Sequence, residues 1–248
     1  MSLAAPVAAA TLSLAVEEPC GLPRQAEPIS LGVPLPRGAV LDVTDLALQD
    51  ASGRLLPLQA EVLGRWPDRS LKWALLDFQL TLAAHEAAEL FLTWDGRDRA
   101  RPLAPALQIT NGPEAILVDT GAAVFRLDRR TFRPFAAIGI GGRDGDALTS
   151  ELHLRDADDR SCLPEIQRLR VAASGPLRAT IRSEGVFRAP DGEALAEFLG
   201  EVTLYAGRGL TRVALTLRNP RPAHHPGGLW DLGDPGSLYF RDLSLSAR

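Results

Sequence analysis

Apolar and polar residues alternate along most of the chain. A period of two recurs in segments such as 11–16, 71–82, 165–171 and 177–188. Successive side chains of a strand point to opposite faces of a sheet, so this period indicates strands with one buried face. No segment carries a convincing amphipathic helical period. The pattern therefore predicts an all-β protein.

The first hundred residues predict a small barrel. Strands are expected at 11–16 and 89–94, with a hairpin turning at Ser52-Gly53. Within 71–82 the apolar set begins with Leu71, Trp73 and Leu75 and then changes phase, which requires a bulge or burial on both faces. We expect residues 11–96 to form a meander that closes a barrel.

Two prolines restrict the segment Ile29–Gly38. Pro34 and Pro36 cannot donate to a β-ladder, so they exclude a helix and a central strand alike. We therefore expect an extended edge or loop segment there.

The stretch 97–105 is rich in Arg, Pro and Ala and carries neither period, so it is the predicted linker. We assign a RIFT-like β-barrel to 1–100 and a large antiparallel β-sandwich to 101–248. The segment 194–200 has helical propensity, but its period of two continues into Tyr205 and favours a strand. The sandwich strands are expected at 115–119, 123–128, 165–171, 177–188, 194–205 and 213–217, the last being the final long strand.

Composition limits the possible partners. The 248 residues, 46% hydrophobic and 23% charged, are those of a globular protein with room for two domains. A net charge of −4 argues against nucleic acid. No apolar run approaches the roughly 18 residues that span a bilayer, so no membrane partner is expected.

Localisation and cysteine state follow from weaker signals. The N-terminal 16 residues are apolar but lack a basic region, so they predict a first strand and a cytoplasmic protein. Cys20 and Cys162 fit no metal spacing and are expected to be unpaired thiols, although the sequence leaves their disulfide state open.

The stretch 219–242, NPRPAHHPGGLWDLGDPGSLYFRD, concentrates the residues suited to chemistry. It holds two of the four His residues and one of the four Trp residues among many Pro and Gly. The candidate substrate-binding residues in and beside it are Arg218, Arg221, His224, His225, Trp230, Asp231 and Asp234.

Three interpretations of this stretch compete. Imidazoles and carboxylates suit a divalent cation, but adjacent His side chains diverge in an extended segment, so we assign no metal and expect no cofactor. Alternatively, His225, Trp230 and Asp231 contact a sugar, because an aromatic face stacks on C–H surfaces while polar groups bond hydroxyls. The simplest interpretation is a loop whose polar side chains satisfy backbone groups.

Catalysis by this stretch would need convergent groups. A β-elimination requires a base, for which His225 is the candidate, and a cation such as Arg218 or Arg221 to neutralise the enolate. Hydrolysis would need a carboxylate pair such as Asp231 and Asp234. The sequence shows convergence for neither, so the catalytic residues stay unknown.

Three barrel segments resemble a known family. Leu31–Gly38, Pro57–Gln59 and Arg65–Trp73, the last reading RWPDRSLKW, resemble the N-terminal RIFT-type barrel of bacterial proteins similar to exo-rhamnogalacturonan lyase. The second half of the chain, ending in the motif His224–Ser237, looks like the central β-sandwich domain of the same proteins. An Asp68-organised turn with an anchoring Trp explains the RWPD residues more simply than a ligand patch does.

The resemblance implies carbohydrate processing. In the larger family members a helical toroid domain follows the two β domains, and lyase chemistry is expected there. We therefore expect this chain to support or orient a catalytic helical domain absent from it, supplied C-terminally or by a partner chain, and not to catalyse alone. A polysaccharide or oligosaccharide is the expected ligand. The alternatives are a non-catalytic carbohydrate-binding module and a structural or assembly module.

Overall fold

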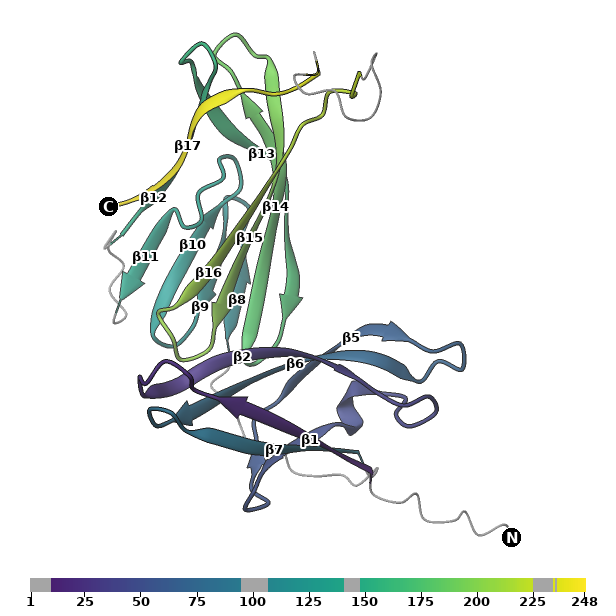
Figure 1. Ribbon diagram of the computed structural model, residues 1–248. Coiled ribbons are helices and arrows are strands. Elements are labelled where there is room, and N and C mark those ends of the chain that lie inside the picture. Colours follow the sequence, from purple (N-terminus) through teal and green to yellow (C-terminus); the bar gives the residue numbers. More distant parts are fainter. Residues whose placement is uncertain (1–9, 95–106, 141–147, 225–233, 235) are drawn as a thin grey trace. The chain divides into compact units, whose positions relative to one another are not determined.

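The computed structural model describes residues 10–94, 107–140, 148–224, 234 and 236–248 (Figure 1). These residues form seventeen strands and one short 3₁₀ helix, η1 (Val43–Asp45), so the all-β prediction is confirmed. The chain divides into two compact units, residues 1–104 and 105–248. The predicted boundary between residues 100 and 101 and the predicted linker lie outside the described residues.

The N-terminal unit is a small barrel of two antiparallel sheets. One sheet has the order β1-β7-β3-β4 and the other β2-β6-β5. Strand β1 pairs with β7 and β2 with β6, so the predicted meander is wrong: neighbours in the sheets are mostly not neighbours in sequence. The strands are β1 (Ala10–Glu17), β2 (Arg24–Pro34), β3 (Ala47–Asp50), β4 (Leu55–Leu56), β5 (Gln59–Arg65), β6 (Leu71–Leu82) and β7 (Ala87–Trp94).

Strand β6 shows why its apolar pattern changes phase. Its even positions from Ala74 to Leu82 face the barrel core, whereas Trp73 is 41% exposed. The register with β5 shifts on both sides of Gly64, the residue that pairs with Trp73. The predicted irregularity is therefore present, but the shifted register lies at the β5–β6 pairing beside the turn.

Strand β2 lies at the edge of its sheet, as its prolines require. It ends at Pro34, and the following Leu35 donates its backbone N–H to the carbonyl of Lys72. Only one side of an edge strand needs ladder donors, so proline is tolerated there. The edge-segment prediction for this part of the chain is confirmed.

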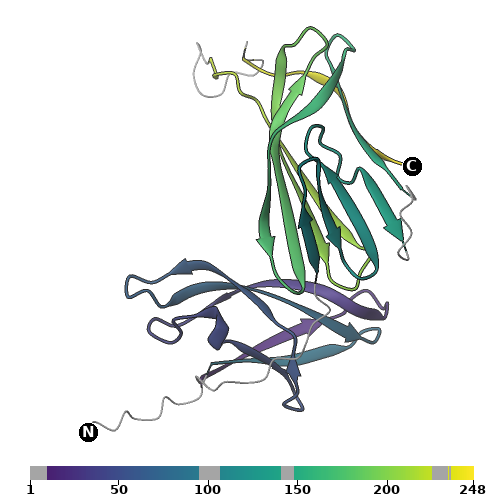
Figure 2. The ribbon, with the colours of Figure 1, turned by 180° about the vertical axis from the view of Figure 1, so that it is seen from behind.

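The second unit is an antiparallel sandwich (Figures 1 and 2). A four-stranded sheet, β11-β10-β9-β8, and a six-stranded sheet, β16-β15-β14-β13-β12-β17, share one core drawn from both. The strands are β8 (Gln108–Asn111), β9 (Ala115–Asp119), β10 (Ala123–Asp128), β11 (Ala137–Ile140), β12 (Ser150–Asp156), β13 (Ser161–Ser174), β14 (Arg178–Arg188), β15 (Ala194–Tyr205), β16 (Thr211–Arg218) and β17 (Phe240–Ala247).

The sandwich core is built from phenylalanines packed on glycines. The ring centroids of Phe132 and Phe198 are 5.3 Å apart, and those of Phe187 and Phe198 are 5.4 Å apart. A Cβ at Gly200 would lie 2.3 Å from Cζ of Phe132, so any side chain at that position would have to displace the ring. The two glycines Gly185 and Gly200 thus set how closely the rings approach the six-stranded sheet.

The end of the chain corrects one prediction. Strand β16 is not the final strand, because β17 follows it and pairs with β12, which the sequence did not predict either. Strand β17 forms one edge of the large sheet, with β12 beside it, and β16 forms the opposite edge. The signal for β17 is short: Leu243 and Leu245 alternate with Asp and Ser directly after a Pro- and Gly-rich loop. No described helix is long and apolar enough to cross a membrane.

Candidate functional site at the loop end of the sandwich

Three connections meet at one end of the sandwich. They are the β12–β13 turn, the β14–β15 turn and the described parts of the segment from β16 to β17, all at the upper end of Figure 1. Arg160 of the first turn pairs with Asp191 of the second, and Arg221 pairs with Glu193. Arg241 donates from Nε to the carbonyl of Ala157 at 2.8 Å. We call this region the loop end.

An ion-pair network fixes the two turns. Arg160 donates from Nε to Oδ2 of Asp156 and from Nη1 to Oδ2 of Asp191, both at 2.7 Å. Asp156 is buried, and its Oδ1 also accepts the backbone N–H groups of Asp158 and Arg160. Burial acts to raise the pKa of Asp156, but these hydrogen bonds and the Arg160 charge hold that pKa below its usual range. The β12–β13 and β14–β15 turns are therefore held together by the ion pairs of Arg160 with Asp156 and Asp191.

The long segment is tied at its two described ends. Asn219 donates from Nδ2 to the carbonyl of Gly236 at 2.7 Å and accepts the backbone N–H of Arg221 at 3.0 Å. The Asp234 carboxylate accepts the backbone N–H groups of His224 and Gly236, each at 2.5 Å. These contacts close the loop on itself, which is the chemistry that the loop interpretation anticipated.

The predicted substrate-binding residues are only partly brought together. Arg218 pairs with Glu197 on β15, whereas Arg221 pairs with Glu193 of the neighbouring turn. Both guanidiniums proposed to neutralise an enolate are thus engaged by carboxylates. His224 and Asp234 do meet, but through the backbone N–H of His224.

The remaining predicted residues, His225, Trp230 and Asp231, lie outside the described residues, so the sugar-contact prediction stays a prediction. Within the described ranges, no group of three or more His, Cys, Asp or Glu side chains is placed to hold a metal ion.

A groove on the outward face of the six-stranded sheet is a feature that the sequence interpretation missed. Its volume is about 450 Å³. The register of β13 against β14 shifts between Ile166 and Arg168, which leaves Gln167 as an extra, bulged residue. The sequence contains a signal for this bulge, because the apolar positions change phase between Ile166 and Leu169. The lining residues are Gln167, Arg182, Glu184, Gly185, Glu197, Phe198, Leu199, Thr216 and Arg218.

The RWPD turn of the barrel is structural. Trp66 donates from Nε1 to the carbonyl of Leu35 at 3.1 Å, and its ring lies 4.8 Å from Nζ of Lys72. Asp68 accepts hydrogen bonds from the hydroxyl and backbone N–H of Ser70, and the hydroxyl contact leads in lowering the pKa of Asp68. An Asp that organises the turn and a Trp that anchors it account for these residues.

The two cysteines are free thiols. Cys20 is exposed, and Cys162 is buried beneath the Asp156–Arg160 turn. Burial raises the pKa of the Cys162 thiol, which keeps it protonated and unreactive at neutral pH.

The fold and these turns define an all-β protein with an N-terminal RIFT-type barrel and a C-terminal sandwich. Residues 19–90 match the model of the PcRGLX-like N-terminal RIFT barrel domain, a range that runs from the β1–β2 connection into β7. The chain is also similar to the "Uncharacterized protein YetA" of Bacillus subtilis (strain 168), at 25% identity over 240 residues. That alignment covers 89% of this chain and 27% of the relative, so the chain spans about a quarter of the length of the curated relative it matches.

Proposed function

We propose that this chain is the β-domain portion of a polysaccharide-active protein resembling exo-rhamnogalacturonan lyases. The observation that carries the proposal is the match of residues 19–90 to the PcRGLX-like RIFT barrel domain. In this role the chain holds a glycan and orients a helical catalytic domain or a partner chain that carries one. The length of YetA, of which the chain spans about a quarter, leaves room for such a domain in a relative.

The loop end supports a role in holding a glycan. Arg160 and Arg221 tie three connections together, so the rim that they form is ordered before a ligand arrives. A preorganised rim loses little conformational entropy on binding, which raises affinity. The segment between its anchors Asn219 and Asp234 carries the predicted sugar contacts His225, Trp230 and Asp231.

One observation favours the alternative of an assembly module. Tyr239, Phe240 and Leu245 are 60, 45 and 50% exposed on and beside β17, an edge strand of the large sheet. Apolar side chains on an edge strand are typical of surfaces that pair with another chain.

Titration calorimetry of the chain with rhamnogalacturonan oligosaccharides tests the proposal. We expect measurable binding and no rise in absorbance from unsaturated uronate, because chemistry belongs to a helical domain. Trp230→Ala should weaken binding at least about tenfold while the protein stays folded. Tyr239→Ala is the matched control, since it removes an exposed aromatic from the same segment.

Three outcomes would contradict the proposal in different ways. Turnover by the chain alone would place catalysis in the β domains. Glycan binding that an added helical domain does not change would favour a carbohydrate-binding module. Absence of binding, together with concentration-dependent association that Phe240→Ser removes, would favour assembly.

A further inference from the structure

Strand β17 turns one side of its backbone away from the described sheet. It pairs with β12 and forms an outer edge of the six-stranded sheet (Figure 1). The backbone groups of Thr149 and Arg248 exchange hydrogen bonds of 2.8 and 2.9 Å, which fixes the phase of the β12–β17 ladder. Hydrogen-bonded pairs alternate along an antiparallel ladder, so the N–H and C=O groups of Leu243, Leu245 and Ala247 point away from β12. These three residues offer a ladder to another strand.

The edge at β17 lacks the protection that other edges of the molecule have. Proteins protect edge strands from further pairing with proline, with charged side chains or with short length. The barrel edge β2 carries Pro28 and Pro34, and β16, at the opposite edge of the large sheet, carries Arg212 and Arg218. Strand β17 has eight residues, no proline, and no charged side chain from Leu243 to Ala247. Among these three edges, β17 is therefore the one suited to pairing.

The face of β17 toward the sandwich core is apolar and only partly covered. Leu243 pairs with Leu154 and Leu245 pairs with Leu152, and both partners belong to the buried core. Leu245 is nevertheless 50% exposed, because β17 is the last strand of its sheet. A further strand beside β17 would cover Leu245 and extend the core, so apolar burial favours pairing.

The apolar positions of β17 match a second copy of the same strand. The ladder with β12 is regular from Asp242 to Arg248 and its register shifts beyond Asp242. An antiparallel pairing of two such segments, with a two-fold axis at Leu245, sets Leu245 opposite Leu245 of the second copy and Leu243 opposite Ala247. Every outward backbone group of these three residues then has a partner, and the leucines of both copies lie on one face.

The polar face of the same pairing is complementary in charge. It sets Asp242 of each copy opposite Arg248 of the other. Within one copy Asp242 lies opposite Arg155 of β12, whose Nη1 is 3.2 Å from Oδ1 of Asp159. The Arg248 side chain is 77% exposed, with Nη2 3.8 Å from Oε2 of Glu151. Opposite charges across a ladder are stabilising and like charges are destabilising, so this register favours a second copy over a strand of unrelated sequence.

We propose that two copies of this chain associate through β17, antiparallel and centred on Leu245, so that their six-stranded sheets join into one. This inference goes beyond the proposed function, because it uses the edge of the sheet and not the segment that contains Trp230. An interface made by one pair of strands is small, so the Kd of the dimer should be on the order of 10 μM.

Sedimentation equilibrium of the whole chain from about 1 to 200 μM tests the inference, because it measures the mass at each concentration. We expect a monomer–dimer equilibrium. Leu245→Lys puts a charge at the centre of the pairing and should weaken association at least about tenfold. Leu163→Lys is the matched control, since Leu163 is 66% exposed on the interior strand β13 and should leave the Kd within about twofold.

Two charge reversals test the register and the identity of the partner. Asp242→Arg alone and Arg248→Asp alone each set like charges opposite each other at two places, so each should weaken association at least about fivefold. An equimolar mixture of the two variants restores opposite charges at both places and should recover the association of the unaltered chain. Circular dichroism checks that all variants fold.

The possible results separate this inference from the proposed function. A chain that stays monomeric at about 200 μM overturns the inference. Association that Leu245→Lys leaves unchanged and Phe240→Ser removes overturns pairing along β17. Folded single charge variants that fail to associate even when mixed overturn the register. Rhamnogalacturonan binding by a monomeric chain leaves the proposed function standing and this inference wrong, whereas a dimer that binds no glycan does the reverse.

Discussion

The barrel and the sandwich bury their cores with different side chains. The barrel core is mostly leucine, with Leu46, Leu48, Leu71, Leu76, Leu90 and Leu92 all fully buried. The sandwich core places phenylalanine rings on Gly185 and Gly200. Flexible leucines fill space from many directions, whereas a ring on a glycine needs one fixed approach. The barrel should therefore be sensitive to lost volume and the sandwich to added volume.

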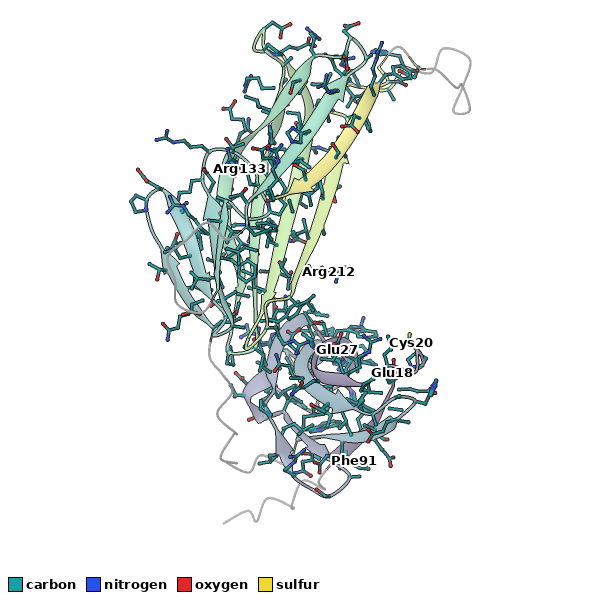
Figure 3. All side chains as sticks on the ribbon, turned by 90° about the vertical axis from the view of Figure 1, so that its left-hand side faces the viewer. Glu18, Cys20, Glu27, Phe91, Arg133 and Arg212 are labelled. Carbon is teal, nitrogen blue, oxygen red and sulfur yellow. The ribbon has the colours of Figure 1, made fainter. Side chains whose placement is uncertain are left out.

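The buried carboxylates of the two units have different partners. Glu18, labelled in Figure 3, accepts backbone N–H groups from Cys20, Gly21, Leu22 and His85. Its contacts fix connections within the barrel. Asp156 instead holds Arg160, which reaches a second turn through Asp191. Glu18 also accepts from Arg24 and joins connections of the barrel, whereas Asp156 reaches through Arg160 to a second turn of the candidate site.

The largest expected effect is the loss of barrel volume. Leu48 is completely buried, so Leu48→Ala should lower the free energy of unfolding by about 2–5 kcal/mol. Denaturant unfolding followed by Trp fluorescence reports mainly on this unit, because three of the four Trp residues, Trp66, Trp73 and Trp94, lie in it. Leu63→Ala, at a side chain 55% exposed, should cost within about 0.5 kcal/mol. Equal losses at the two positions would contradict the burial argument.

The sandwich should respond to a single added methyl group. Gly200→Ala brings a Cβ within 2.3 Å of the Phe132 ring and should cost about 1–3 kcal/mol. Gly209→Ala meets nothing within 4 Å and is the matched control. Calorimetric unfolding measures both. Phe132→Leu should be costly alone but should recover part of the Gly200→Ala loss, because the two residues share one space. Simple additivity of the two changes would argue against the clash.

Acid should weaken the barrel through Glu18. Burial acts to raise its pKa, but four backbone N–H donors lower that pKa from 4.5 to about 2. Between these pH values the unfolded chain binds the extra proton, so the stabilisation is complete above pH 4.5 and is lost as pH falls toward about 2. Glu18→Gln should flatten this part of the pH profile measured by Trp fluorescence, and Glu27→Gln on β2 is the control. An unchanged profile in Glu18→Gln would contradict the assignment.

Local patterns predicted the strands better than their pairing. Alternation alone placed β9 and β10 at the observed residues and favoured a strand over a helix at 194–205. It did not predict that β1 pairs with β7, because pairing between distant strands is decided by core packing and not by either segment alone. It also passed over β12 and β17, whose short apolar alternations adjoin polar turns.

The candidate site shows the same limit. Composition drew attention to Arg218, Arg221, His224 and Asp234, and the structure places the last three at the loop end. Their partners could not be read from the sequence, since Glu193 lies 28 positions from Arg221 and meets it only because two turns share an end of the sandwich. The groove on the outward face of the six-stranded sheet likewise forms only where β13, β14, β15 and β16 lie side by side.

The smallest expected effect tests whether the loop end depends on single pairs. Arg221 and Glu193 lie 3.3 Å apart with side chains 41 and 51% exposed, so Arg221→Ala should cost under about 1 kcal/mol. A double-mutant cycle with Glu193→Ala should give a small coupling energy that falls as salt rises. In this variant the backbone N–H groups of position 221 and of Gly236 should stay protected from hydrogen exchange, because Asn219 and Asp234 still accept their hydrogen bonds. If Arg221→Ala instead removes that protection, the Arg221–Glu193 ion pair orders the segment. That result would contradict the role assigned to the hydrogen bonds of Asn219 and Asp234.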